Sequence, residues 1–232
     1  MRKYNIEEYV SSRNDEIEKD NIARQCLEIA NSAQFPTDYQ DVYDHLFEDD
    51  SYIRVFVKNE FDEIKGFAII CNENVLNNLN IMHVHGIIIH PEAQGLGLAK
   101  EVINTAVEKY QTDVVTAKTH NPRCFNMFAD ILNNGCDFYP NTQPIPSYIY
   151  EIVKKDKFID KADEDLICRD AYPDVKIQQS KRKELVNDVF EKVGPYDAQA
   201  IVVVVNKNVK EKTIKPKNII IKKTRRIIWQ EK

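Results

Sequence analysis

The chain lacks three features, and each absence argues against a class of protein. No apolar run in its 232 residues is long enough to span a bilayer, so a membrane-spanning protein is not expected. The first ten residues lack the apolar centre of a signal peptide. No C-x-x-C pair occurs, and the cysteines are scattered and odd in number, which argues against a zinc knuckle and a disulfide framework. Together these absences predict a cytoplasmic, reduced protein.

The composition is that of a soluble globular protein, with 43% apolar and 30% charged residues. Its length suits one large domain, or one domain with an appendage. The net charge of −5 conceals a basic end, because residues 206–232 hold ten Lys or Arg and two Glu. Such an end could meet nucleic acid, but its charges alternate with Ile219–Ile221 and Ile227–Trp229 and form no compact helix face. We therefore expect a solvated strand pair there and no nucleic-acid partner.

The stretch from Ile81 to Lys100 is the one around which the rest is organised. Residues Ile81–Ile89 are dense in β-branched and apolar residues and predict a strand. Pro91 marks a turn, and a glycine-bearing segment then opens a helix at about Leu98. The first amide groups of a helix have no internal acceptor, and glycines let the backbone approach a phosphate closely. This stretch is therefore predicted to bind an anion.

Two familiar phosphate-binding motifs do not fit the glycine turn. The P-loop pattern is absent, and a dinucleotide turn would need a glycine where Lys100 stands. The pattern Q/R-x-x-G-x-G/A does fit, as Gln94, Gly97 and Ala99. With the run-in Ile87–Glu92, this segment resembles the pyrophosphate-binding signature of the GNAT superfamily of acetyl-CoA-dependent N-acetyltransferases. The alternative is an ordinary strand, turn and helix with incidental glycines.

The order of predicted elements is also similar to that family. Helices are expected at 15–33 and 38–49, strands at 52–58, 66–71 and 81–89, the signature helix, a strand at 113–119, a helix at 121–134, and strands at 136–139 and 147–153. The resemblance covers about residues 1–153 and implies an α/β (α+β) fold, a GNAT-like mixed central sheet flanked by helices. Residues 154–232 are expected to form a C-terminal α+β extension of unknown role, with a helix at 180–193, a strand at 200–206 and a last strand or hairpin. It would pack on the core or on a second subunit, which makes a homodimer a candidate assembly.

The resemblance implies acetyl-CoA as co-substrate and assigns residues to it. The pantetheine arm would lie between Ile87–Ile89 and residues 116–121, where the two strands of the family diverge. The implied cofactor-binding residues are Ile87, Ile88, Ile89, Gln94, Gly95, Leu96, Gly97, Leu98, Ala99, Lys100, Asn121 and Phe128. No third ligand is suitably spaced from the histidines discussed next, so no metal is expected.

Acetyl transfer to an amine needs a base, and His83 and His85 are the candidates. Strand alternation would put both on one face with Ile87 and Ile89. A histidine titrates near neutral pH and can take an ammonium proton directly or through water. The pair also resembles the arylalkylamine N-acetyltransferase branch, and the resemblance implies that a backbone N–H near Ile88 or Ile89 binds the carbonyl oxygen. The alternative is that both are satisfied core histidines.

The position that often holds the family's tyrosine acid is Phe128, which has no proton to give. Cys124, Tyr139, Tyr148 and Tyr150 are the replacements considered, or the thiolate could leave unprotonated. The acceptor is expected to be a small-molecule or protein amine. Residues 38–50 hold six Asp or Glu and no Lys or Arg, which would either attract a cationic amine or simply form the wet face of a helix.

Two functions therefore remain open after the sequence is read. The first is an N-acetyltransferase that acts by direct attack of a primary amine on acetyl-CoA in a ternary complex. The second is a non-catalytic acyl-CoA-binding sensor or assembly module of the same fold, which Phe128 and the long extension leave open.

Overall fold

The computed structural model describes residues 3–9, 16–33, 35, 37–75, 79–131, 136–141, 143–171, 189–190, 192–206 and 208–214. Most of the expected helix at 180–193, and the strand or hairpin expected after residue 214, lie outside this part of the chain. The strands are β1 Tyr4–Tyr9, β2 Ile53–Asn59, β3 Ile64–Val75, β4 Leu79–Ile89, β5 Val114–Thr119, β6 Asp137–Tyr139, β7 Ile167–Cys168 and β8 Ala198–Val204. The helices are α1 Glu16–Ser32, α2 Tyr39–Phe47, the short 3₁₀ helix η1 Pro91–Ala93, α3 Leu98–Lys109, α4 Pro122–Ile131, α5 Ser147–Val153 and α7 Val209–Ile214.

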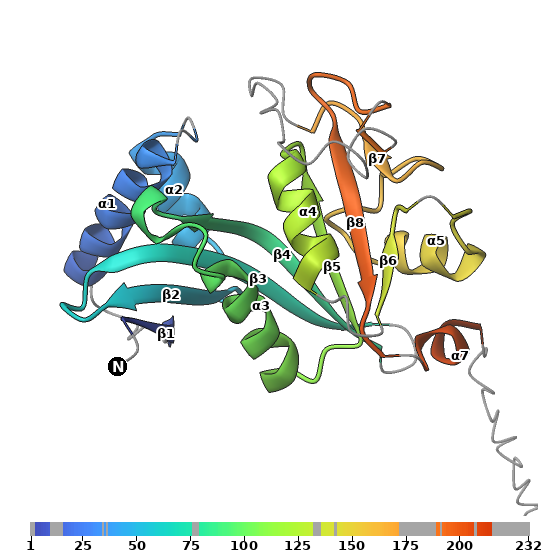
Figure 1. Ribbon diagram of the computed structural model, residues 1–232, viewed down its shortest axis with the longest axis horizontal. Helices are drawn as coiled ribbons and strands as arrows, with labels where there is room; N and C mark the ends of the chain where they lie inside the picture. The colour runs from blue at the N-terminus through green and yellow to red at the C-terminus, as the bar shows by residue number, and fades with distance from the viewer. Residues whose placement is uncertain are drawn as a thin grey trace, which may run out of the picture.

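One mixed sheet runs through the molecule in the order β1-β2-β3-β4-β5-β8-β6, with β7 paired to β8 (Figure 1). All neighbours are antiparallel except β4 and β5, which are parallel. The chain can join parallel strands only through a long crossover, and the segment with η1 and α3 supplies it. The glycine turn therefore lies where the chain leaves the middle of the sheet.

Helices cover both faces of the sheet. On one face α3 and α4 pack on a single core cluster that includes Val84, Val102 and Phe125. The other face carries two clusters, one under α1 and α2 and one under α5. Figure 1 shows α1 and α2 at one end of the sheet and α5 and α7 at the other. The middle of this second face, between the two clusters, is where the polar side chains described below are found.

The segment 147–153, expected as a strand, is a helix, and that prediction was wrong. Its buried side chains are Tyr148, Ile149, Ile152 and Val153, a spacing of three to four residues that fits a helical stripe. Pro146 immediately precedes the helix and serves as its N-cap residue. The short apolar run satisfies both a strand and a helix, because seven residues are too few for periodicity to decide between them.

Two further strands differ from expectation. Strand β1 was not predicted, because Tyr4–Tyr9 holds two adjacent glutamates that mask its alternation; β1 is an edge strand, where such residues stay in water. Strand β8, expected within an extension, lies inside the central sheet between β5 and β6. All seven residues of β8 are buried, which confirms that this apolar run is covered on both faces. The sheet thus crosses the boundary drawn at residue 153, and the two-domain division stays a prediction.

Candidate active site

The glycine turn has the backbone that the sequence pattern requires. Gly95 and Gly97 have φ of 78° and 79°, in the left-handed region that favours glycine. Gly97 is the N-cap residue of α3, and its carbonyl oxygen accepts the first bond of the helix from the amide of Glu101 at 3.0 Å. The backbone amide groups between Gly97 and Glu101, at the start of α3, have no acceptors within the helix. Together with the helix dipole, they form a site suited to a phosphate group.

Side chains fix this turn to the strand before it and the helix beside it. The Gln94 amide Nε2 donates to the carbonyl oxygen of Ile89 at 2.8 Å, which links the turn to the end of β4. Lys100 Nζ donates to the carbonyl oxygen of Asp130 at 3.2 Å and so links α3 to α4. Leu98 is buried at the start of α3, while Leu96 is 58% exposed at the tip of the turn. Ala99 is partly buried in the first turn of α3.

Strands β4 and β5 separate beside this turn. Their parallel pairing runs from Ile81 with Val114 to Val84 with Ala117 and then stops. Strand β4 continues to Ile89 paired only to β3, while β5 continues paired only to β8. The edge of Ile87–Ile89 that would face β5 therefore lacks a strand partner among the described strands. The Ile89 carbonyl oxygen accepts from Gln94, and the other backbone groups along this edge have no partner among the described strands, as expected where strands diverge.

A β-bulge at His85 decides which side chains share a face of β4. Ile69 of β3 pairs with Gly86 and Ile70 pairs with Val84, so His85 is the extra residue. One extra residue reverses the alternation beyond it. Ile87 and Ile89 consequently pack with Val84 on the α3 and α4 side, whereas His83 lies on the opposite face. The expectation that the histidines share a face with Ile87 and Ile89 was therefore wrong.

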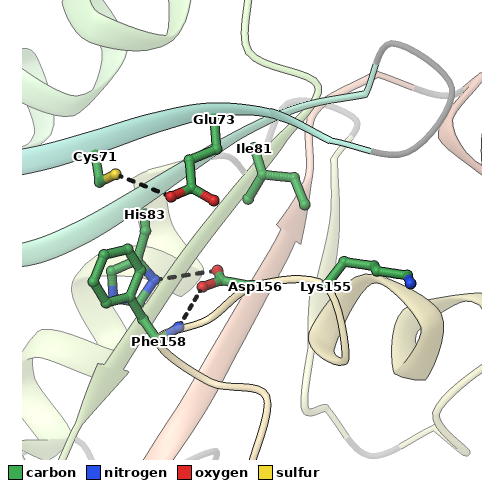
Figure 2. A pocket seen from close by; sticks show the side chains of 7 residues that line it. All are labelled: Cys71, Glu73, Ile81, His83, Lys155, Asp156 and Phe158. Carbon is green, nitrogen blue, oxygen red and sulfur yellow. Dashed lines mark hydrogen bonds and ion pairs between the residues drawn. The ribbon is translucent and has the colours of Figure 1, made fainter. Parts of the chain in front are cut away.

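His83 is buried and held by two polar groups. Its Nδ1 lies 2.9 Å from Thr116 Oγ1, its direct partner in the β4–β5 register, and 3.3 Å from Asp156 Oδ2. The Thr116 hydroxyl in turn donates to the same carboxylate oxygen. The ring of Phe158 stacks on His83 at 4.4 Å between ring centroids (Figure 2). The other ring nitrogen, Nε2, is buried and has no hydrogen-bond partner among the described residues.

His85 belongs to a cluster of rings with a different electrostatic character. His45 of α2, Tyr52 and Phe158 surround it, with ring centroids 5.5, 5.5 and 5.3 Å away. Burial, followed by the nearby charges of His83 and His45, lowers the pKa of His85 to about 4. His85 is therefore neutral at physiological pH. It can donate or accept a hydrogen bond, but it is a weak base for an ammonium ion.

A small pocket opens beside His83 (Figure 2). Its lining comes from β3, β4 and the segment after α5, and comprises Cys71, Glu73, Ile81, His83, Lys155, Asp156 and Phe158. Next to this lining, the Lys157 ammonium pairs with Glu73 at 2.8 Å. The sequence reading missed residues 155–158 because they lie beyond the expected boundary at residue 153 and carry no motif. Only the tertiary fold brings residues 155–158 next to His83.

The remaining predicted residues lie in less direct positions. Asn121 precedes α4, where its Oδ1 accepts from the amide of Arg123 at 2.9 Å and its own amide donates to Thr119 Oγ1 at 3.0 Å. Phe128 is 1% exposed and packs in the core with Phe125. The contact of either residue with a cofactor stays a prediction.

The side chains considered as acids in place of Phe128 are buried or make other contacts in the structure. Tyr139 and Tyr148 lie in the core cluster under α5, and burial together with the Tyr139 hydroxyl raises the pKa of Tyr148. The Tyr150 hydroxyl donates to the carbonyl oxygen of Glu164 at 2.8 Å. Burial raises the pKa of Cys124 to about 11. The three tyrosines thus belong to the cluster under α5 or contact the segment after it, whereas the Cys124 thiol lies beside Thr119 at the end of β5.

Two searches of the described residues gave negative results. No helix there is long and apolar enough to cross a membrane. In the same ranges, no group of three or more His, Cys, Asp or Glu side chains is placed to hold a metal ion.

Comparison with known proteins adds a family to this geometry. Residues 21–129 match the model of the acetyltransferase (GNAT) family, a range that begins in α1 and includes the glycine turn and both histidines. A comparison with curated proteins found no match. The chain thus carries a GNAT acetyltransferase domain over these residues.

Several solved acetyltransferases resemble the chain at low identity. The ribosomal-protein-S18-alanine N-acetyltransferase from Escherichia coli is 12% identical, with 93% of this chain and 98% of that chain covered and a TM-score of 0.49. A Bacillus subtilis acetyltransferase in complex with CoA is 12% identical, with coverage of 87% and 99% and a TM-score of 0.48. A GNAT family acetyltransferase from Staphylococcus aureus is 17% identical, with coverage of 47% and 79% and a TM-score of 0.39. Structural similarity with TM-scores below 0.5 does not indicate a substrate. The assignment of the GNAT domain therefore rests on the family match.

Proposed function

We propose that this protein transfers an acetyl group from acetyl-CoA to a primary amine by direct attack in a ternary complex. The observation that carries the proposal is the position of His83, buried at the point where β4 and β5 separate, with an unpartnered Nε2. An amine attacks only after losing its ammonium proton, so the reaction needs a base beside the thioester. The match to an acetyltransferase family supports the reaction class.

The binding of acetyl-CoA would use two features of the backbone. The amide groups at the start of α3 suit the pyrophosphate, since they point outward and carry the positive end of the helix dipole. The free edge of Ile87–Ile89 suits the pantetheine arm, which can pair with it much as a strand would. In this proposal no metal takes part.

The chemistry would divide between backbone and side chains. An amide on the free edge of β4, near Ile88 or Ile89, would bind the thioester carbonyl oxygen as negative charge develops on it. His83 would take the amine's proton, and neutral His85 would orient the amine or a water molecule beside it. The thiolate would leave unprotonated and take a proton from solvent.

The acceptor is proposed to be a cationic amine, on either a small molecule or a protein. Glu73 lines the pocket beside His83, and His45 of α2 connects the acidic face of that helix with the histidine cluster. Two acidic residues of this face make contacts within α2 itself. Asp38 caps the helix by accepting from the amide of Asp41, and Asp41 pairs with His45 at 3.2 Å. These contacts favour the wet-face reading of the helix, and steering of the amine remains a secondary part of the proposal.

Two proposals concern the setting of the enzyme. All five cysteines are free thiols, which is in keeping with a cytoplasmic, reducing environment. A homodimer through the C-terminal extension stays a prediction, because much of that extension lies outside the described residues.

Calorimetric titration with acetyl-CoA tests the cofactor site first. Gly97→Glu places bulk and negative charge where the pyrophosphate should lie, and it should abolish binding. Thr105→Glu is the matched control, because it adds the same charge to an exposed position further along α3 and should leave the dissociation constant unchanged. Wild type that fails to bind acetyl-CoA, or equal binding by both variants, would count against the proposal.

A non-catalytic CoA-binding module is the second candidate function. Phe128 favours it, because a buried phenyl ring occupies the position where the resembled family often has its acid. Free-thiol release with a panel of amines separates the two functions. Turnover that the double substitution His83→Ala and His85→Ala lowers by roughly 10²–10⁴-fold would support the enzyme. Binding of acetyl-CoA with no turnover of any amine would support the module.

A further inference from the structure

We propose that Asp156 is a positioning residue for His83: it keeps a proton on Nδ1 and so leaves Nε2 as the lone pair that receives the amine's proton. The inference rests on the acetyl transfer proposed above. Asp156 follows α5 and lies 73 residues after His83 in the chain. It is 4% exposed, as deeply buried as the histidine it contacts.

Counting protons assigns the tautomer of His83. Three polar atoms meet in one buried space: His83 Nδ1, Thr116 Oγ1 and Asp156 Oδ2. The threonine hydroxyl has a single proton, and it donates that proton to the carboxylate. If Nδ1 carried no proton, it would face two oxygen atoms with no hydrogen to share. Nδ1 therefore donates, and because a neutral imidazole has one N–H, Nε2 holds the lone pair.

The ionised state of Asp156 supports this count. Burial by itself would raise the pKa of this carboxyl, but the hydrogen bonds and charge of His83 and the hydroxyl of Thr116 hold the pKa below its usual range. An ionised carboxylate only accepts hydrogen bonds, so it cannot supply the missing proton to Nδ1. The arrangement also stabilises the imidazolium that forms once Nε2 has taken a proton.

Asp156 is itself held firmly. Its Oδ1 accepts from the amide of Phe158 at 2.9 Å (Figure 2). Its own backbone amide donates to the carbonyl oxygen of Ile152 at 3.2 Å, at the end of α5. The Phe158 ring then stacks on the histidine it helps to place. One short segment thus fixes both the carboxylate and the plane of the ring, which is how a supporting group orients a reacting one.

Acetyl transfer moves protons and breaks one bond as it forms another. The ammonium of the acceptor transfers its proton to His83 Nε2, and the freed amine nitrogen attacks the thioester carbon. The C–N bond forms, the nitrogen releases its second proton to solvent, and the C–S bond breaks. The product is the neutral amide, and CoA leaves as the thiolate. The imidazolium, with both nitrogens protonated, keeps its Nδ1–H on Asp156 and later returns the Nε2 proton to solvent.

Among the described residues, Asp156 is the one titratable group within hydrogen-bond distance of the His83 ring. Other charged or titratable groups lie further from it. They are Cys71 and Glu73 of β3, His85 of β4, Lys155 after α5, and His45 of α2 beside His85. Loss of the Asp156 charge should therefore dominate any change in the pH dependence of turnover.

Kinetics of Asp156→Asn give the first test. The substitution keeps the shape of the side chain but removes its charge, and its amide can donate to Nδ1 and force the proton onto Nε2. We expect kcat to fall by roughly 10–100-fold, with the KM for the amine unchanged and the acidic limb of the pH profile moved to lower pH. Asp160→Asn, an exposed neighbour, is the control and should behave as wild type. A variant with wild-type kcat and pH profile would overturn the inference.

Nitrogen-15 NMR of the histidine side chains gives a second test that needs no turnover. Wild-type His83 should carry its proton on Nδ1, and a wild-type Nε2–H tautomer would overturn the inference by itself. If Asp156→Asn does not fold, two substitutions of Thr116 replace it. Thr116→Ser should keep the Nδ1–H tautomer and the wild-type pH profile. Thr116→Val should lower the population of the Nδ1–H tautomer and change the pH profile. Wild type that turns over no amine would end the proposed function and with it the catalytic role of the pair, while the tautomer would still show whether Asp156 fixes the ring.

Discussion

At the scale of single residues, two neighbouring histidines with the same sequence context have different chemistry. His83 contacts a carboxylate and a hydroxyl, whereas His85 is surrounded by rings and by other histidines. His85 is also the extra residue of the β-bulge in β4, whereas His83 pairs regularly with Cys71. In the proposed mechanism the pair supplies one base and one neutral hydrogen-bonding group, a division that equal spacing along a strand would not suggest.

The lowered pKa of His85 predicts a pH dependence of folding stability. The folded-state pKa of about 4 lies below the ordinary value of 6.5, so between these values the unfolded chain binds a proton that the folded chain does not. Stability should therefore fall as the pH drops from about 6.5 towards 4. At pH 5 the loss should be about 1 kcal/mol, after discounting for the solvent that reaches this half-buried ring.

Urea denaturation at pH 7 and pH 5 measures this effect. His85→Gln removes the titrating group, so the variant should lose less stability than wild type on acidification. The comparison uses the difference between the two proteins at each pH, because the carboxylates common to both also titrate as the pH falls. A difference that is the same at pH 7 and pH 5 would show that His85 does not titrate in this window.

At the scale of elements, the turn before α3 depends on two residues in a left-handed conformation. No heavy atom lies within 4 Å of where a Cβ would stand at Gly97, so a substitution there meets a backbone cost and no steric clash. Gly86, in the bulge of β4, also has open space, but its φ lies outside the left-handed range. Gly97 and Gly86 therefore differ in backbone strain alone, since neither position is crowded.

Gly97→Ala should destabilise the protein by about 1 kcal/mol, the cost of an L-residue in the left-handed region. For a chain of this size, that corresponds to a drop in Tm of about 2–4 °C. Gly86→Ala should leave the Tm nearly unchanged, and differential scanning calorimetry of both variants makes the comparison. Equal melting temperatures for the two variants would mean that the turn does not require the conformation seen here.

At the scale of the whole molecule, the central sheet depends on residues from both ends of the chain. Strand β1 forms one edge, and β8 lies between β5 and β6 near the other. The segment after α5 crosses the same face and carries Asp156 to His83. The chain beyond residue 153 therefore completes both the core and the candidate site.

A chain that ends at residue 153 should fail to fold. It would lose β8, all of whose residues are buried, and would leave β5 and β6 without the strand between them. A chain that ends at residue 214 retains every described element and is the matched control. Far-UV circular dichroism and size-exclusion chromatography of both would decide. A soluble, folded monomer of residues 1–153 would support the two-domain division instead.

Local patterns made much of this protein predictable. Glycine geometry and helix initiation are properties of a few adjacent residues, so the turn at Gln94–Lys100 and the start of α3 at Leu98 follow from the sequence. The apolar stripes of α1, α2 and α3 are equally local, and so is the cap of α2 at Asp38. The family match then confirmed what the six-residue pattern had indicated.

Tertiary structure alone decided the rest, because it depends on contacts between distant residues. A strand and a short helix can share the apolar run at 147–153, and only packing against the sheet selects the helix. The bulge at His85 depends on the pairing of β3 with β4 and changes which side chains share a face. The meeting of Asp156, Thr116 and His83 joins three segments that no spacing rule connects. The sequence thus determined the backbone of the glycine turn, and the fold decided which groups lie beside His83.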